Sequence, residues 1–251
     1  MGASQRFCLD ERASERLPRG GTVSAMRETR HRFREDLKEL ERQTLEGIDL
    51  VVAQLDRALK SLRDHDVELA VQVVAAEDRI DRRSLEIHQS VFLLLARQTP
   101  VAGDLRILAA LLHVIRYVER MGAQCSNIAK LVPLSGTEPT TDNEIREAIE
   151  QMAQLARGEV VQAKEAFHSR DVTLAEDLVG KDAGIARLSR ELFYRSVAIG
   201  DDIDVREWAM LMVLVARCLE RIAENAVAIA EQTVFVVSGL FREFAGPPQF
   251  T

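Results

Sequence analysis

An internal duplication constrains the fold of this chain more than any other feature. Asp66-Val-Glu-Leu-Ala70 recurs as Asp171-Val-Thr-Leu-Ala175, and further along Arg116-x-x-Glu119-Arg120 recurs as Arg217-x-x-Glu220-Arg221. Matches in the same order over such a length indicate a repeated structural unit. The sequence therefore predicts two copies of one fold in tandem.

Within the first copy, apolar residues recur every three or four positions, which is typical of long amphipathic helices. The first stripe runs from about residue 27 to residue 63, and Asp66 is placed to cap a second helix. Thr99-Pro100 is expected to end that helix and to start the third, with threonine as N-cap and proline at the first helical position. The third helix ends near Pro133.

The second copy repeats this plan after a linker. Thr141-Asp-Asn-Glu144 has the spacing of a capping box at a helix start, and Asp171 is placed to cap the next helix. The Gly200-Asp-Asp202 corner precedes a last helix that runs to about Val237. The predicted divisions are a disordered extension over 1–25, a first three-helix repeat over 26–132, a linker over 133–141, a second repeat over 142–239 and a flexible tail over 240–251.

The predicted fold class is all-α, with two tandem antiparallel three-helix bundles and six long helices. A helix of about 30 residues is about 45 Å long, and short connections make neighbouring helices antiparallel. A three-helix unit has a narrow core and leaves apolar helix surface uncovered. We expect the second bundle, and a second subunit, to cover that surface.

Charge and composition narrow the class of partner and compartment. The net charge of −7 argues against nucleic acid, which needs clustered Lys and Arg. Cys8, Cys125 and Cys218 show no Cys-x-x-Cys spacing, which fits a reducing cytoplasm and two buried helical cysteines. No apolar run approaches the about 20 residues of a membrane span, so we expect contact with a membrane only through partners. The polar first segment does not resemble a signal peptide, which leaves Met26 as an alternative start.

The sequence carries no familiar catalytic pattern. Gly-x-Ser-x-Gly and the Gly-rich nucleotide motifs are missing, and neither Cys125 nor Cys218 has a His within one helical turn. Glu-x-x-His, which dimetal bundles use, occurs at 28–31 and 165–168, but both copies fall at helix ends, where a dry metal cage would not form. His113 is expected in the core or at an interface. We predict that the protein is not an enzyme.

Paired acids are the most distinctive polar residues. Glu77 and Asp81 are four residues apart, as are Glu220 and Glu224, so the two acids of each pair lie on one helix face. Their negative charges repel each other unless a cation neutralises them. Ion pairing with nearby arginines is the local explanation, and then no cofactor is required. The alternative is one weakly bound divalent cation or iron with retained waters, because the ligands are hard oxygens.

The third helix of each copy resembles the signature segments of the PhoU family. The segments are Arg116-Tyr-Val-Glu-Arg-Met-Gly122 and Val215-Ala-Arg-Cys-Leu-Glu-Arg-Ile-Ala-Glu224. Thr99-Pro-Val-Ala-Gly-Asp-Leu-Arg106 resembles the family's entry into its third helix, and Val234-Phe-Val-Val-Ser-Gly239 its C-terminal close. The resemblance extends from Met26 to Gly239.

This resemblance implies a homodimer or higher oligomer with a cytoplasmic role in phosphate homeostasis. It implies a negative regulator of phosphate uptake and phosphate-starvation signalling. Such a regulator would bridge the ATPase subunit of the phosphate ABC transporter to a membrane sensor histidine kinase.

The resemblance also implies metal binding, since several members hold metal clusters through a Glu/Asp-x-x-x-Asp motif on these helices. The candidate ligands carried over to this sequence are Glu77, Asp81, Glu119, Asp182, Glu220 and Glu224. Tyr117, Ala123, Ala186 and Cys218 stand where the family often has acids, so a multinuclear cluster is not expected.

We predict that partner proteins dock on helix faces with an apolar centre and a charged rim. The candidate contact residues are Arg116, Glu119, Arg120, Arg217, Glu220 and Arg221. Two other classes stay open: a metal-storing or redox bundle, and a purely structural scaffold. No Gly-rich anion nest and no focused Arg cluster indicates direct phosphate sensing.

Overall fold

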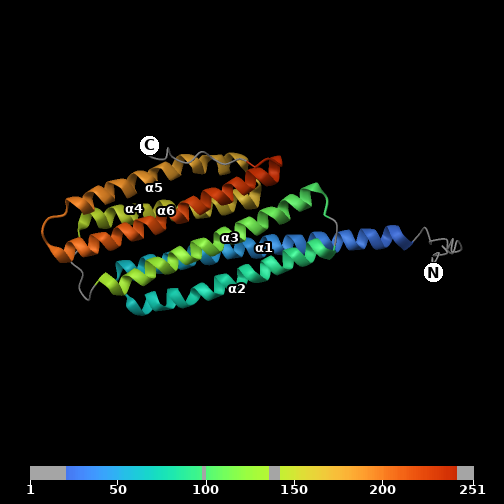
Figure 1. Cartoon of the computed structure of the whole chain (residues 1–251). Helices are drawn as coiled ribbons and strands as arrows, with labels where there is room; N and C mark the ends of the chain where they lie inside the picture. The colour runs from blue at the N-terminus through green and yellow to red at the C-terminus, as the bar shows by residue number, and fades with distance from the viewer. Residues whose placement is uncertain (1–20, 98–99, 136–141, 242–251) are drawn as a thin grey trace, which may run out of the picture.

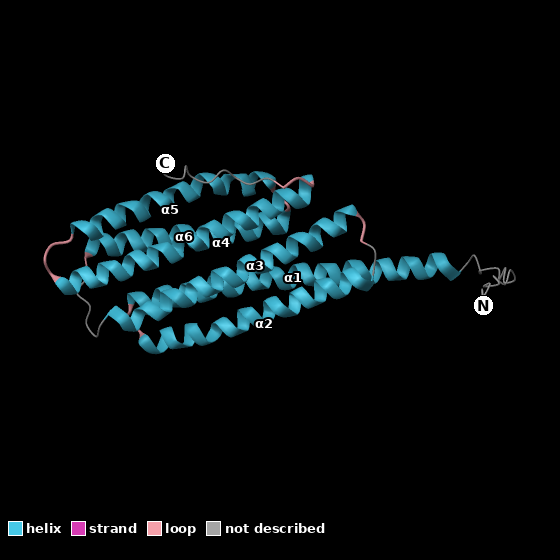
Figure 2. Ribbon diagram, in the orientation of Figure 1, coloured by secondary structure: helices cyan, strands magenta, loops and turns pink. Residues whose placement is uncertain are grey.

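The structure, a computed structural model, describes residues 21–97, 100–135 and 142–241. These residues form long α-helices and one 3-10 helix, and they include no strand (Figure 2). The elements are α1 (Gly21–Arg63), α2 (Val67–Arg97), α3 (Ala102–Leu131), η1 (Val132–Ser135), α4 (Asn143–Ser169), α5 (Val172–Ala198) and α6 (Ile203–Ser238). The predicted all-α fold with six long helices is confirmed. None of these helices has an apolar stretch of the length that a bilayer crossing demands.

The helices form two antiparallel three-helix bundles that lie side by side (Figure 1). One bundle contains α1, α2 and α3, and the other contains α4, α5 and α6. α3 packs along α6, α1 contacts α4, and the buried apolar side chains of both bundles form one continuous core. Each bundle thus covers apolar surface that the other cannot bury alone, as predicted.

The apolar stripe that predicts α1 is the face that it buries. Leu37 is 5% exposed, and Ile48 and Leu55 are fully buried. The helix begins at Gly21, so residues 21–25 are helical and are not part of an irregular extension. Hydrophobic periodicity misses this start because the side chains described between residue 27 and Phe33 are exposed and charged or polar. Residues 1–20 lie outside the described ranges.

Aspartate carboxylates cap the starts of four helices, and Asp142 of α4 is described below. Asp66 accepts the backbone N–H of Leu69 at 2.9 Å, and Asp171 accepts that of Leu174 at 3.0 Å, both as predicted. Asp202 caps α6 in the same way. Each carboxylate satisfies a backbone donor that the helix leaves unpaired and places negative charge at the positive end of the helix dipole.

The predicted start of α3 is wrong by two residues. Val101 is the N-cap, in an extended conformation, and the helix begins at Ala102, so Pro100 precedes the helix instead of opening it. Thr99 lies outside the described residues. The fixed φ of proline suits an extended segment as well as a first helical turn, so proline alone does not locate the start.

The predicted capping residue of α4 is wrong by one position. Asp142, and not Thr141, is the N-cap, and its carboxylate accepts the backbone N–H of Ile145 at 3.0 Å. The same carboxylate accepts a hydrogen bond of 2.8 Å from Arg195 of α5, which holds its pKa below the usual range. The carboxylate that caps α4 is therefore also held by a contact with a distant segment.

The second bundle ends in a glycine cap. Gly239 has φ 77°, a left-handed conformation that favours glycine, and its N–H donates to the carbonyl of Phe235. Phe241 stacks on Phe235 with ring centroids 4.0 Å apart. The first residues beyond the predicted second repeat therefore pack against α6. Residues 136–141 of the linker and 242–251 of the tail are outside the described ranges.

α2 and α3 pack closely where Gly122 of α3 faces Ile80 of α2. A Cβ atom at position 122 would lie 2.9 Å from Cδ1 and 3.3 Å from Cγ2 of Ile80. Gly158 of α4 is exposed and has open space beside its Cα. Close packing thus requires glycine at the first position and not at the second.

We expect Gly122→Val to lower the free energy of unfolding by about 1–3 kcal/mol, because the added methyl groups overpack the contact with Ile80. Gly158→Ala is the control and should raise it by about 0.5–1 kcal/mol, since alanine favours the helix. Urea unfolding followed by circular dichroism measures both. A Gly122→Val chain as stable as the wild type would contradict the close approach of α2 and α3.

Candidate functional site

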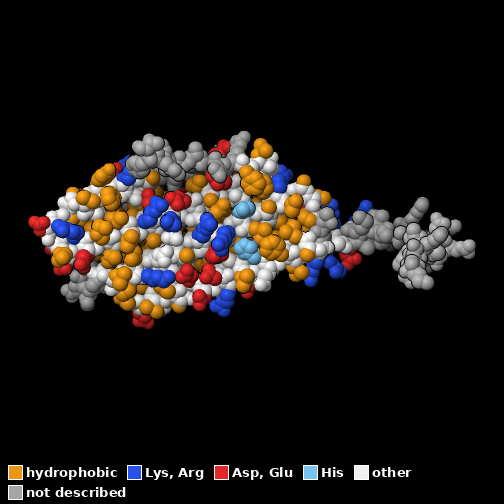
Figure 3. Space-filling model, viewed as in Figure 1, with side chains coloured by type: hydrophobic (Ala, Val, Ile, Leu, Met, Phe, Trp, Pro, Cys, Tyr) orange, Lys and Arg blue, Asp and Glu red, His pale blue; other side chains and the backbone are white. Residues whose placement is uncertain are grey.

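The six predicted contact residues lie on two helices that pack side by side. We define the α3–α6 face by Arg116, Glu119 and Arg120 of α3 and Arg217, Glu220 and Arg221 of α6. The four arginines are exposed and the two glutamates are partly buried. Figure 3 looks onto this side of the molecule and shows charged side chains near its middle, between areas of hydrophobic side chains.

The two helices present equivalent positions on this face. Residues three or four apart in a helix share one side, and the exposed residues at that spacing are His113, Arg116 and Arg120 on α3 and Leu214, Arg217 and Arg221 on α6. His113 is exposed, so it is not a core residue. The duplication thus places the same charged pattern twice on one surface, with His113 in one copy where the other has Leu214.

Each copy contains the same ion pair. Arg116 donates to both carboxylate oxygens of Glu119, at 2.8 and 3.1 Å, and Arg217 donates to Glu220 at 3.1 Å. Arg217 also lies 3.9 Å from Glu224. The hydrogen bond to Glu220, strengthened by both negative charges, raises the pKa of Arg217. In the second repeat the paired acids are therefore neutralised by a neighbouring arginine, as the local explanation predicts.

Three residues where the family often has acids are buried or partly buried. Cys218 is buried, Tyr117 is half-buried, and Ala123 is partly buried.

Burial raises the pKa of the Cys218 thiol and of the fully buried Cys125 thiol, so both stay protonated near neutral pH. The interpretation of both cysteines as small buried residues is confirmed. Cys8 lies outside the described residues.

The candidate metal ligands of the first repeat meet between α2 and α3. Desolvation raises the pKa of the Asp81 carboxyl, and the negative charges of Glu119, Glu77 and Asp78 raise it further. Lys130 Nζ lies 3.8 Å from Glu77, and Arg116 pairs with Glu119. The tertiary structure therefore places Glu119 of α3 near enough to Asp81 of α2 for their charges to interact, and it supplies Glu77 and Glu119 with a cation from the chain itself.

The candidate ligands do not form a metal cage among the side chains that the structure describes. No group of three or more His, Cys, Asp or Glu there could hold a metal ion. In the second repeat Arg217 forms ion pairs with Glu220 and Glu224. The side chain of Asp182 is not among those that the structure describes. The described donors therefore do not fit a multinuclear cluster.

The two Glu-x-x-His tetrapeptides lie on solvated helix surface. His31 pairs with Glu35 at 3.4 Å, with both side chains largely exposed, and Glu28 pairs with Arg32. Glu165 and His168 are exposed near the end of α4. Both histidines are therefore exposed to solvent, and Glu28 and His31 lie inside α1, not at a helix end as predicted.

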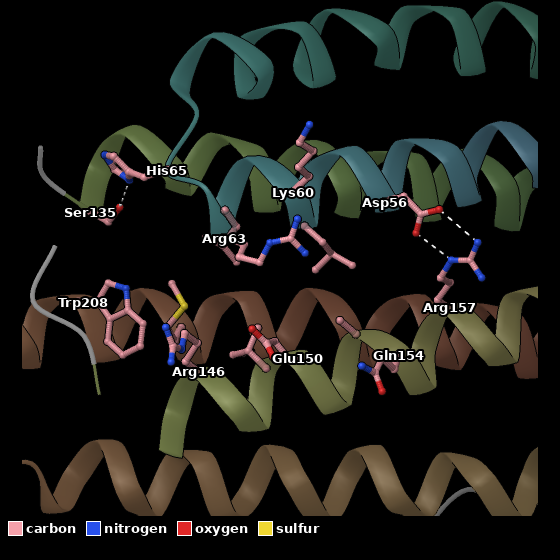
Figure 4. A pocket seen from close by; sticks show the side chains of 15 residues that line it. Asp56, Lys60, Arg63, His65, Ser135, Arg146, Glu150, Gln154, Arg157 and Trp208 are labelled. Carbon is pink, nitrogen blue, oxygen red and sulfur yellow. Dashed lines mark hydrogen bonds and ion pairs between the residues drawn. The ribbon is translucent and has the colours of Figure 1, made fainter. Parts of the chain in front are cut away.

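A cavity of about 680 Å³ between the two bundles was not predicted from the sequence. It lies between the end of α1, η1 and the first turns of α4 and α6 (Figure 4). Its charged lining consists of Asp56, Lys60, Arg63, Arg146, Glu150 and Arg157. The sequence shows no focused cationic cluster because α1 and α4 contribute these residues from distant segments.

We expect Asp81→Asn to raise the free energy of unfolding at neutral pH by a few tenths of a kcal/mol, because it removes repulsion among acids. Because folding raises the pKa of the Asp81 carboxyl, the folded state binds its proton more tightly than the unfolded state does. Proton binding therefore stabilises the folded state at low pH, where the carboxyl is protonated. That stability is lost as the pH rises from the unfolded pKa of about 3.9 through the folded pKa. The gain from Asp81→Asn should therefore disappear near about pH 3.

Urea unfolding at several pH values measures this effect, with Glu86→Gln as the control. Glu86 is an exposed acid of α2 that lies 3.8 Å from Arg83, so its neutralisation should bring no gain at neutral pH. An Asp81→Asn chain that is less stable than the wild type at neutral pH would contradict the repulsion.

Comparison with known proteins places this architecture in one family. The model of the PhoU domain matches residues 44–132 and 149–233, one match in each bundle. The phosphate-specific transport system accessory protein PhoU homolog 1 of Mycobacterium leprae is 31% identical, over 84% of this chain and 95% of the relative. PhoU homolog 2 of Mycobacterium tuberculosis is 30% identical, over 83% of this chain and 98% of the relative.

Solved structures agree with this assignment. The phosphate transport system regulatory protein PhoU from Streptococcus pneumoniae superposes with a TM-score of 0.78 at 25% identity, over 84% of this chain and all of that one. PhoU from Pseudomonas aeruginosa gives 0.73 at 27% identity, over 83% of this chain and all of its own. With a family match in both bundles and relatives at 30% identity over nearly their full length, this chain belongs to the PhoU family.

Proposed function

We propose that this protein is a negative regulator of phosphate uptake and phosphate-starvation signalling, and that it acts as an adaptor and not as an enzyme. Its relatives are named as accessory proteins of phosphate-specific transport, and one solved neighbour as a regulatory protein of that system. The observation that carries the proposal is the duplicated α3–α6 face. Two PhoU domains present the same Arg-x-x-Glu-Arg segment side by side on a surface open to solvent.

The proposed partners are the ATPase subunit of a phosphate ABC transporter and a membrane sensor histidine kinase, which the protein would meet in the cytoplasm. Met210 and Leu214 are exposed on the side of α6 that carries Arg217 and Arg221. Apolar area of this kind contributes affinity, and the charges select the partner and speed association. Two copies of the pattern would let one molecule engage two sites on its partners at once.

We also propose a homodimer. Large apolar side chains, among them Phe92, Phe193, Tyr194 and Val197, are each about half or more exposed on the single chain. Exposed apolar residues mark a surface that other proteins cover where they cluster, and Phe193, Tyr194 and Val197 lie within two turns of α5. A second subunit is one such cover, and light scattering on the purified chain measures the oligomeric state.

Deletion of the coding sequence tests the regulator against a structural scaffold. The regulator predicts that phosphate uptake and phosphate-starvation genes stay active in phosphate-rich medium without the protein. A scaffold predicts that both are unchanged. Unchanged uptake and unchanged expression in the deletion strain would therefore defeat the proposed function.

Charge reversal on the α3–α6 face tests the docking surface. We expect a chain with Arg116→Glu, Arg120→Glu, Arg217→Glu and Arg221→Glu to lose at least about tenfold in affinity for the ATPase subunit or the kinase, because like charges then face the partner. Pull-down and titration with the purified partners measure the loss, and complementation of the deletion strain should fail in parallel.

The matched control is Arg30→Glu with Arg34→Glu. Both arginines are exposed on α1, at the same spacing of four residues, away from the α3–α6 face. This chain should bind and complement as the wild type does. Equal binding by the wild type and by the variant with four reversals on the α3–α6 face would show that the partners dock elsewhere.

A weakly bound cation is the alternative that the acids around Asp81 favour. Desolvation and repulsion by neighbouring acids both raise the pKa of Asp81, and a cation would relieve the repulsion. The ion pairs of Glu77, Glu119 and Glu220 argue against any metal that the fold requires. We expect removal of divalent metal with a chelator to change the free energy of unfolding by less than about 0.5 kcal/mol. A larger loss that Mn²⁺ or Fe²⁺ restores, with metal found in the purified protein, would support the cation.

A further inference from the structure

We propose that the cavity between the two bundles is a binding site for a nucleoside phosphate. The site goes beyond the proposed function, since it does not lie on the α3–α6 face and does not depend on which proteins the chain regulates. The cavity of about 680 Å³ falls in the range of small-molecule pockets, about 300–1,000 Å³. Its walls come from both bundles, with α1 on one side and α4 and α6 on the other (Figure 4).

The charge of the lining opposes that of the chain. The protein carries a net charge of −7, yet Lys60, Arg63, Arg146 and Arg157 line the cavity against only two acids, Asp56 and Glu150. A concave surface of one sign with low-dielectric walls concentrates ions of the opposite sign. The lining therefore carries more positive than negative side chains and favours an anion, although the net charge of the chain is negative.

The arginines of the lining differ in whether an acidic side chain of the protein already forms an ion pair with them. Arg157 is committed to Asp56, to which it donates two hydrogen bonds of 2.8 and 3.2 Å. Arg146 donates to the neutral side chain of Asn143 at 3.1 Å, and no ion pair joins it to an acid among the described residues. Arg63 donates a hydrogen bond of 3.1 Å to its chain neighbour Asp64, and this ion pair faces the solvent, with the Arg63 side chain 61% exposed.

Arg63 and Arg146 thus offer guanidinium groups from opposite walls. Figure 4 shows Arg63 on the α1 side and Arg146 on the facing side, next to Trp208. Guanidinium groups bind phosphate oxygens through two parallel hydrogen bonds. An exposed guanidinium group loses few interactions with the protein when it binds a phosphate. Two such groups on separate elements suit a phosphate chain better than a single carboxylate.

The rest of the lining is mostly apolar, with His65, Ser135 and Gln154 as its uncharged polar residues, and it includes the only tryptophan of the chain. The apolar lining residues are Leu59, Leu62, Ile149, Ala153, Trp208 and Met212. Inorganic phosphate would leave this surface uncovered, and an uncharged apolar ligand would leave the arginines without a partner. A nucleoside phosphate uses both parts, with its base against Trp208 and the aliphatic side chains and its phosphates at Arg63 and Arg146.

The experiment uses the full chain, in phosphate-free buffer, with adenosine diphosphate as the probe. Because Trp208 is the only tryptophan, its fluorescence reports on the cavity directly. We expect a saturable fluorescence change and a matching heat of binding by calorimetry. Adenosine and inorganic phosphate, tested separately, should each bind at least about tenfold more weakly, because each fills only one part of the site.

Paired variants locate the site. Arg63→Gln with Arg146→Gln should weaken binding of adenosine diphosphate at least about tenfold, through the loss of two charge-assisted contacts. Arg30→Gln with Arg34→Gln removes the same charge from α1, outside the cavity and the α3–α6 face, and should bind adenosine diphosphate as the wild type does. Circular dichroism checks that both variants fold, and both carry changes only at exposed side chains.

Several results would overturn the proposal. They are a wild-type chain that gives neither a saturable fluorescence change nor heat, equal affinity for adenosine diphosphate and inorganic phosphate, and binding unaffected by the Arg63 and Arg146 substitutions. None of these measurements involves the transporter or the kinase. A failure here is therefore distinct from a failure of the proposed regulatory function.

Discussion

The packing of α3 against α6 is the interaction on which the rest of this structure depends. A three-helix bundle buries too little apolar surface to account for all the buried positions seen here, and the continuous core exists because two such bundles share one interface. Cys125 of α3 and Cys218 of α6 are both buried. Hydrophobic burial between the repeats thus joins two short units into one body.

This packing also determines which side chains of α3 and α6 face the solvent. Once the inner sides of α3 and α6 are buried, Arg116 and Arg217 can only point outward, and each forms an ion pair within its own helix. Surface pairs of this kind add little stability, so the fold does not depend on them. The same contact between bundles sets α1 opposite α4 and forms the walls of the cavity.

The fold and the outer face were predictable because both follow from local periodicity. Stripes of apolar residues assign the core side of each helix, and residues such as Arg116 and Arg120 lie on the other side by geometry alone. Helix starts were predicted less well. Asp142 caps α4 one residue after the predicted Thr141, and it is also bonded to Arg195 from another helix. Local patterns cannot include such contacts.

The sequence by itself determined the helices, their duplication and the exposure of the charged segments, because these properties depend on residues within a few turns of one another. Only the tertiary structure decided which charges of different helices meet. Lys130 of α3 reaches Glu77 of α2, and Arg63 and Arg146 come to opposite walls of one cavity. The physical reason is that electrostatic interaction depends on distance in space, and packing between helices, not separation along the chain, sets that distance.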